Sequence, residues 1–286
     1  MMIKGEIVMD YCLKNYAIRE RNGNIRIKAT DKKQQIVGYT VWMLALLTGY
    51  GFYSFEYKEV NFAEALMQTV GNLITMFTQP AYKHFTISEA FYQLGLTIGL
   101  ALLTTILGGI LALFLGLLAA RNLSTARVSA AIRGGVAFIR AVPTILWVLI
   151  FAVTAGLGSV AAVIGLSFHS VGYLIKAYSE SFEEIDIGTI EAMQTSGANW
   201  WQIVFQAVLP SSLSALLAWT FLRFEINFTN AVAMGAAAGA GGIGYELFMA
   251  GNFYFDLQEM GLITYLILGF AVLLETCSAR IKVLVK

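Results

Sequence analysis

Long apolar runs separated by short polar stretches dominate the hydropathy pattern of this chain. A helix needs about 20 mostly apolar residues to cross the hydrocarbon core of a bilayer. Six runs approach or exceed this length, at 37–55, 95–120, 136–156, 158–177, 213–235 and 261–279, and the run at 95–120 contains no charged residue. The pattern therefore predicts an all-α membrane protein with six transmembrane helices. Within the third run, Pro143 is expected to kink the helix.

Composition agrees with a membrane location. Of the 286 residues, 58% are hydrophobic and 13% are charged, whereas soluble domains carry about 25% charged residues. The net charge of +1 gives no indication of a nucleic-acid partner. The two cysteines, Cys12 and Cys277, lie near opposite ends of the chain. Since no Cys/His spacing resembles a metal site, neither a metal nor another cofactor is expected.

The basic residues predict the orientation of the spans. With six spans both termini lie on one side, and fifteen of the nineteen basic residues flank the spans on that side. Only Lys58 and Lys83 lie on the other side, while Arg140 and Arg223 fall within spans. By the positive-inside rule both termini are cytoplasmic in a multi-pass protein of the cell membrane. Residues 1–36 then form a cytoplasmic segment and residues 37–286 form the transmembrane domain.

The glycine-rich stretch GAGGIG at 239–244 fits the dinucleotide-binding pattern G-x-G-x-x-G, and Glu259 lies twenty positions after Gly239. That pattern has a meaning only after a buried strand and at the start of a crossover helix. Here it follows a membrane-length apolar run, so the agreement is interpreted as coincidence. None of the ten lysines follows a glycine, so the chain contains no P-loop. If ATP drives transport, another subunit must hydrolyse it, and the chain itself is not expected to be an enzyme.

The longest connection on the predicted cytoplasmic side covers about 178–212. It contains EAMQTSGANWWQIVFQAVLP, which resembles the EAA motif of ABC importer permeases. The positions that match the motif are Glu191, Ala192, Gly197, Leu209 and Pro210, while Met193 and Ala207 depart from it. The resemblance implies a short helix-turn-helix that docks on an ATPase subunit. Gly197 is expected to break the first helix and Pro210 to stop the second before the next span.

An alternative for this segment is an amphipathic helix lying on lipid headgroups. Such a helix is typically rich in Lys and Arg on its polar face. The stretch 178–222 contains neither residue type. Docking on a protein partner is therefore favoured.

Three further stretches narrow the resemblance to permeases of phosphonate-, phosphite- and phosphate-type importers. They are LAARNL at 118–123, IRAVPT at 139–144 and LRFEINFTNAVAMGAAAGAGGIGYEL at 222–247. Thr229 departs from the family, whose members often carry a second basic residue there. The resemblance implies a type I ABC importer permease fold and a homodimer working with two copies of an ABC ATPase subunit and an extracytoplasmic solute-binding protein. It implies import of phosphonate, phosphite or a similar small phosphorus oxyanion by alternating access.

The fifth span carries polar residues on one helical stripe. Arg223, Asn227 and Asn230 follow one another at helical spacing, and Trp219 lies one turn before Arg223. A charged group in a span must face protein or water because its insertion costs about 3 kcal/mol. Two interpretations remain open: Arg223 and its neighbours line the path of an oxyanion, or the charges of this span form buried ion pairs, for instance Glu225 with Arg140. For Glu225 the structural role is favoured, and Trp219 is placed to stack on Arg223.

The glycines at the end of this span allow a tight turn at membrane depth, with a new helix beginning near 243. The positions concerned are Gly239, Gly241, Gly242 and Gly244. Exposed amides at such a helix start attract anions. The alternative is that the glycines only permit close packing of helices at an outer gate.

Two alternative functions remain open. The same machine could carry another small solute, such as an amino acid or a different oxyanion. A secondary transporter driven by an ion gradient is the less favoured class, because it predicts more membrane-embedded acids than Glu225.

Overall fold

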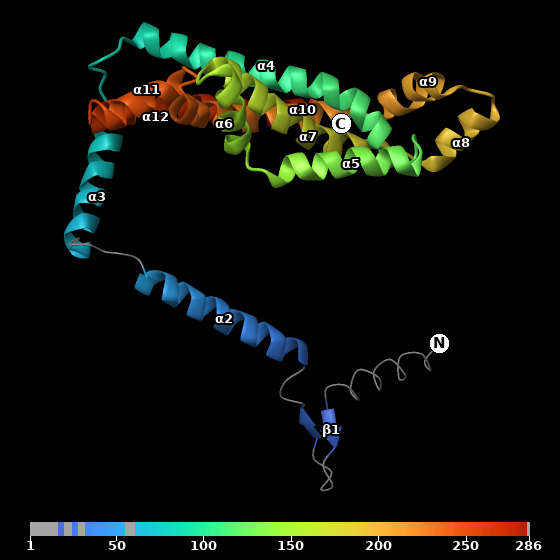
Figure 1. Ribbon diagram of the computed structural model, residues 1–286, viewed down its shortest axis with the longest axis horizontal. Helices are drawn as coiled ribbons and strands as arrows, with labels where there is room; N and C mark the ends of the chain where they lie inside the picture. Colours follow the sequence, from blue (N-terminus) through green and yellow to red (C-terminus); the bar gives the residue numbers. More distant parts are fainter. Residues whose placement is uncertain (1–16, 20–24, 28–31, 55–60, 285–286) are drawn as a thin grey trace. The chain divides into compact units, whose positions relative to one another are not determined.

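The computed structural model describes residues 17–19, 25–27, 32–54 and 61–284 (Figure 1). The chain divides into two compact units, Met1–Ala65 and Leu66–Lys286. In the first unit, β1 (Ala17–Arg19) pairs antiparallel with β2 (Ile25–Ile27). The hydropathy pattern did not predict this small hairpin.

The long helix of the first unit is α2 (Lys32–Ser54), which confirms the predicted first apolar run and begins a few residues earlier. Its 23 residues span about 35 Å, which is enough to cross a bilayer. None of them is buried. Two threonine hydroxyls within it donate to backbone carbonyls one turn back, Thr40 to Ile36 and Thr48 to Leu44. In lipid these bonds satisfy both threonine hydroxyls within the helix itself.

The second unit is a helical bundle. It holds most of α3 (Phe62–Thr78) and all of α4 (Ile87–Ala119), α5 (Ala126–Ala141), α6 (Thr144–Ala155), α7 (Ser159–Glu183), α8 (Ile187–Thr195), α9 (Trp200–Ile203), the π-helical turn η1 (Val204–Val208), α10 (Leu209–Ala238), α11 (Ile243–Asn252) and α12 (Leu257–Leu284). Within the described residues, five helices are long and apolar enough to cross a membrane, or six if the bent pair α5–α6 counts as one span.

Helix α4 shows how small residues bring the bundle together. It begins at a capping box in which Thr86 accepts from the backbone of Glu89, and it runs for 33 residues. That length is about 50 Å and exceeds the hydrocarbon core, so the apolar run at 95–120 marks only its lipid-immersed part. A Cβ placed on Gly108 would lie 2.8 Å from the Cβ of Ser170, so α4 and α7 pack in close contact. The exposed face of α4 instead carries large apolar side chains, as expected for a surface facing lipid.

The predicted bend at Pro143 is present, and it is a full break of the helix rather than a kink. The helices α5 and α6 meet at 90°, and Val142 between them is extended. Proline removes a backbone donor and disfavours helical geometry in the residue before it, so Pro143 ends α5 and caps α6. In Figure 1, α6 lies across the direction of α4 and α10. Gly165 permits this crossing, because a Cβ there would come within 2.6 Å of the backbone of Val148.

The expectation that Pro210 stops a helix was also wrong. Residues 200–238 form one continuous helical rod in which α9, η1 and α10 follow without a break. Before the proline the rod widens into a π-helical turn, where Leu209 N–H donates to the carbonyl of Val204. The wider turn relieves the clash between a proline ring and the preceding turn. Gly197 does break the segment as predicted, with a φ of +81° between α8 and α9.

Two apolar core clusters occupy opposite parts of the bundle. The first contains Leu174, Phe182, Val204 and Val208, and joins α4, α5 and α7 to α8, α9 and the start of α10. The second joins the other parts of α4, α7 and α10 to α6, α11 and α12, and its largest member is Phe228. Between these clusters along α4, α7 and α10 lies a layer of polar side chains.

Candidate functional site

Arg223 lies at the centre of this polar layer. Its side chain is 1% exposed, although it sits midway along α10. Its Nε donates to Ser170 Oγ at 3.1 Å, and an NH2 group lies 3.2 Å from Nδ1 of His169. Because a guanidinium can only donate, Nδ1 of His169 must accept, so this imidazole is neutral with its proton on Nε2. Among the described residues, no carboxylate forms an ion pair with Arg223.

Asn227, one turn further along α10, ties three helices together. It is fully buried, and its amide donates to Thr105 Oγ1 of α4 and to Ser170 Oγ of α7, both at 2.9 Å. Ser170 gives its own hydrogen to the carbonyl of Leu166 at 2.7 Å. Both lone pairs of its hydroxyl are then free to accept, one from Asn227 and one from Arg223. The layer thus fixes the position of a positive charge using neutral groups alone.

The expected stacking of Trp219 on Arg223 was wrong. The guanidinium lies 5.1 Å from the ring centroid of Tyr173, and Trp219 packs edge-on against that tyrosine at 6.4 Å. Tyr173 stands one turn after His169 on α7 and so reaches Arg223 from the same helix. Asn230 is partly exposed and lies outside the buried network of Arg223 and Asn227.

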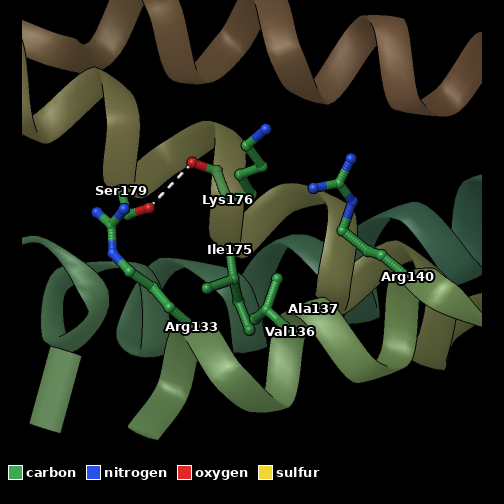
Figure 2. Close-up of a pocket in the computed structure, with 7 residues that line it drawn as sticks. All are labelled: Arg133, Val136, Ala137, Arg140, Ile175, Lys176 and Ser179. Carbon is green, nitrogen blue, oxygen red and sulfur yellow. Dashed lines mark hydrogen bonds between the residues drawn. The ribbon is translucent and has the colours of Figure 1, made fainter. Parts of the chain in front are cut away.

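The suggested ion pair between Arg140 and Glu225 is not present among the described residues. Glu225 is partly exposed on the face of α10 opposite Arg223. Arg140 is exposed near the end of α5, where it lines a cavity of about 210 Å³ between α5 and α7 (Figure 2). Arg133 and Lys176 line the same cavity.

The glycine-rich turn links α10 to α11, which begins at Ile243 as predicted. Gly239 ends α10 in the left-handed conformation, with a φ of +62°. The first amides of α11 already have partners, because Gly242 N–H donates to Gln93 Oε1 and Ile243 N–H donates to Thr97 Oγ1 of α4. This occupation favours the packing interpretation of the glycines over an anion site.

Gly241 and Gly244 lie in the same compact arrangement. A Cβ on Gly244 would overlap the backbone carbonyl of Val232. The carbonyl oxygen of Gly241 lies within 2.7 Å of the place where Gly235 would carry a Cβ. The turn therefore folds back closely on the end of α10.

The EAA-like residues divide between two places. Glu191 and Ala192 are exposed on α8, and Gly197 is exposed at the bend that follows. Helices α8 and α9 lie at one end of the bundle in Figure 1. Leu209 packs against the first core cluster, and Pro210 lies in the first turn of α10. A cavity of about 460 Å³ between α8 and α9 is lined in part by Ala192 and Gly197.

Helix α9 is anchored to the rest of the bundle by Trp200. Its indole Nε1–H donates to the carbonyl of Leu123 at 2.8 Å, in the turn between α4 and α5. The same turn is held by Asn122, whose amide donates to the carbonyl of Phe182 at 2.7 Å. Both Asn122 and Leu123 belong to the LAARNL stretch. Movement of α9 would therefore act on α4 and α5 as well as on α10.

At the opposite end of the bundle, a polar clasp joins the α3–α4 loop to the start of α12. Glu259 is 1% exposed and accepts from the backbone of His84 at 2.8 Å, and its other oxygen lies 2.7 Å from His84 Nδ1. Lys83 Nζ donates to Asp256 Oδ2 at 2.7 Å, and this hydrogen bond holds the pKa of Asp256 below its usual value. Glu259 therefore binds His84 within the protein. It does not have the ribose-binding role that the G-x-G-x-x-G pattern would imply in a dinucleotide-binding fold.

The partners of Arg223 and Asn227 were not singled out as site residues from the sequence. They are Thr105, His169, Ser170 and Tyr173, which come from α4 and α7. His169, Tyr173 and Lys176 do recur at helical spacing, so a polar face of α7 was available as a signal. This polar face was not recognised because most residues around His169 in the predicted span are apolar.

Two of the curated relatives of this chain have related names. The phosphate-import permease protein PhnE of Mycolicibacterium smegmatis is 35% identical over 161 residues, which cover 56% of this chain and 30% of that protein. The phosphite transport system permease protein PtxC of Stutzerimonas stutzeri is 33% identical over 144 residues, which cover 50% of this chain and 52% of that protein. The matched part therefore spans about half or less of the length of these relatives.

Among solved structures, an inward-facing form of the MetNI methionine ABC transporter matches with a TM-score of 0.62 and 23% identity, covering 68% of this chain and 94% of that chain. An amino acid ABC transporter crystallised with histidines matches with a TM-score of 0.56 and 14% identity, covering 78% of this chain and 98% of that chain. These likenesses show that the fold is that of a type I ABC importer permease, as predicted.

The sequence model of one family covers Arg223 and Asn227 with their partners on α7, the glycine turn and the EAA-like segment together. That family is described as the binding-protein-dependent transport system inner membrane component, and it matches residues 112–284, which is more than half of the chain. The chain therefore belongs to the family of binding-protein-dependent transport system inner membrane components.

Proposed function

We propose that this chain is the membrane-spanning permease subunit of an ATP-driven importer for phosphonate, phosphite or a similar small phosphorus oxyanion. It acts as a homodimer with two ATPase subunits and an extracytoplasmic solute-binding protein, and both termini are cytoplasmic. Residues 1–36 form a cytoplasmic segment, and 37–286 form the permease domain with a coupling segment at about 178–212. The observation that carries the proposal is the exposed helix-turn-helix α8–α9, which bears the EAA-like residues and continues directly into the helix of Arg223.

The rod 200–238 supports a mechanical role for this helix-turn-helix. From Trp200 to Arg223 the helix extends about 35 Å without a break. A force applied by a partner at α8 and α9 therefore reaches the polar layer as a movement of a rigid element. The bond from Trp200 to Leu123 transmits the same movement to α4 and α5. The chain supplies no P-loop, so the force must come from a separate ATPase.

The polar layer supports an anionic substrate. Arg223 retains a full positive charge whose hydrogen-bond partners Ser170 and His169 are neutral. A carboxylate partner would cancel this charge, whereas neutral acceptors leave it available to an approaching anion. Arginine also suits oxyanions because its fork of N–H donors matches two oxygens at once. The printed names of the relatives, phosphate and phosphite permeases, belong to the same chemical class.

The test is uptake of phosphite into proteoliposomes containing the permease, the ATPase and the binding protein. Uptake should require ATP and the ATPase, and Glu191→Ala should lower it by weakening the contact at α8. Glu184→Ala is the matched control, because it removes another exposed carboxylate just before α8. Uptake without the ATPase, or equal uptake by both variants, would contradict the coupling scheme. Offering methionine and other amino acids to the binding protein separates the proposal from the same machine with another solute.

A further inference from the structure

The cavity between α5 and α7 has a basic lining that the polar layer around Arg223 does not account for. Arg133 and Arg140 reach it from α5, and Lys176 reaches it from α7. Figure 2 shows the guanidinium of Arg140 and the ammonium of Lys176 pointing to the same side of the cavity. The remaining lining is apolar apart from Ser179. Three cations around a volume of about 210 Å³ are unusual in a membrane-length bundle.

Two of the three cations have partners. Arg133 forms an ion pair with Glu183 at 2.5 Å and also donates through Nε to the carbonyl of Ala119. Lys176 lies 3.6 Å from Glu180 on the same helix. Both of these acids are at the end of α7, beyond the centre of the bundle. The three cations and these two carboxylates therefore leave a net charge of +1 around the cavity.

Arg140 carries that excess. Among the described residues no carboxylate forms an ion pair with it. Arg140 also lines a neighbouring cavity of about 190 Å³. The rest of that lining includes Tyr173, Trp219 and the pair of Lys176 and Glu180. Tyr173 is the ring on which Arg223 stacks, so this second cavity reaches the polar layer. Arg140 and Lys176 thus stand between the buried charge of Arg223 and the predicted cytoplasmic end of the bundle.

We propose that the α5–α7 cavity binds a tetrahedral phosphorus oxyanion group, with Arg140 as its main ligand and Lys176 as the second cation. A volume of 210 Å³ equals that of about seven water molecules, which accommodates one such group with part of its hydration shell. Arginine binds two oxygens of the group, and lysine adds a point charge. The group comes either from a free phosphate-like ion or from the headgroup of an anionic phospholipid.

This inference rests on the proposed function only for the choice of a phosphorus oxyanion. The experiment uses the purified full-length chain without ATPase or binding protein, so failure of the site and failure of transport are separate results. Phenylglyoxal modifies accessible arginines, and peptide mass spectrometry measures the rate at Arg140 and at Arg127. Arg127 is the control, because it is exposed on α5 but does not line the cavity.

In lipid-free detergent, inorganic phosphate is compared with chloride at matched ionic strength. The rate at Arg140 should fall about fivefold when phosphate is at about four times its dissociation constant, because only the unoccupied site reacts. The rate at Arg127 should not change, and Lys176→Met should weaken the protection of Arg140.

A second arm compares nanodiscs of phosphatidylglycerol and phosphatidylcholine without added phosphate. Protection of Arg140 in the first arm identifies a free ion, and protection only in phosphatidylglycerol identifies a headgroup. No protection in either arm, or equal protection of Arg127, overturns the proposal.

Discussion

The contact between Asn227 and Thr105 allows the polar layer to be tested as a structural element. The two bonds from the Asn227 amide, to Thr105 and to Ser170, cross between helices. Hydrogen bonds between transmembrane helices contribute about 0.6 kcal/mol on average and up to about 1.7 kcal/mol. Asn227→Leu removes both bonds while keeping a side chain of similar size, and should lower the free energy of unfolding by roughly 1–3 kcal/mol. Thr105→Val removes one of them without changing shape.

A double-mutant cycle isolates this single bond. The coupling energy between Asn227→Leu and Thr105→Val should be about 0.6–1.7 kcal/mol. It is measured by reversible unfolding in mixed micelles of increasing dodecyl sulfate content, followed by tryptophan fluorescence. Thr104→Val is the matched control, because Thr104 is equally buried but donates to the carbonyl of Ala101 and makes no bond to Asn227. A coupling below about 0.3 kcal/mol for Thr105, or the same coupling for Thr104, would refute the arrangement of the layer.

Two further predictions concern the glycine turn and the polar clasp. Gly244→Ala should lower the thermal unfolding midpoint, because the new methyl group overlaps the carbonyl of Val232. The expected loss is equivalent to about 1–3 kcal/mol or more of unfolding free energy. Gly269→Ala is the control, since open space surrounds Gly269 and the variant should not be destabilised. A carboxyl whose pKa is lowered in the folded protein adds stability above its unfolded pKa, about 3.9 for Asp, and this stability is lost as the pH falls through the folded value. Asp256→Asn should therefore lower the unfolding midpoint at pH 7 but have a smaller effect near pH 3, and an equal effect at both pH values would show that the bond with Lys83 does not act in this way.

The sequence was sufficient for the elements whose long apolar runs contain no proline. The runs at 213–235 and 261–279 lie within α10 and α12, and the run at 95–120 ends one residue beyond α4. The prediction for Pro210 failed, and the prediction for Pro143 had the position of the bend but not its size, because the effect of a proline depends on packing that a single sequence does not show. At Pro143 the close approach of Val148 to Gly165 supports a full 90° break. At Pro210 a π-helical turn absorbs the ring and leaves the helix continuous.

For the site, helical spacing placed Arg223 and Asn227 on one stripe, and the structure buries both. Their hydrogen-bond partners on α4 and α7 are separated from them by 53 to 122 positions along the chain. Only the packing of three helices brings these groups together. The choice of Trp219 as the stacking partner failed for the same reason, because Tyr173 on another helix occupies the space beside the guanidinium.

The central claim is that the positive charge of Arg223 attracts and stabilises a phosphorus oxyanion as it crosses the membrane. The direct test is ATP-driven uptake of phosphite by the complete transporter in proteoliposomes, comparing the wild type with Arg223→Gln and Arg223→Lys. Arg223→Gln should lower uptake about tenfold or more, equivalent to about 1.4 kcal/mol, while the complex still assembles and hydrolyses ATP. Arg223→Lys should retain part of the uptake because it keeps the charge without the fork of donors. Uptake by Arg223→Gln at the wild-type rate would contradict the claim.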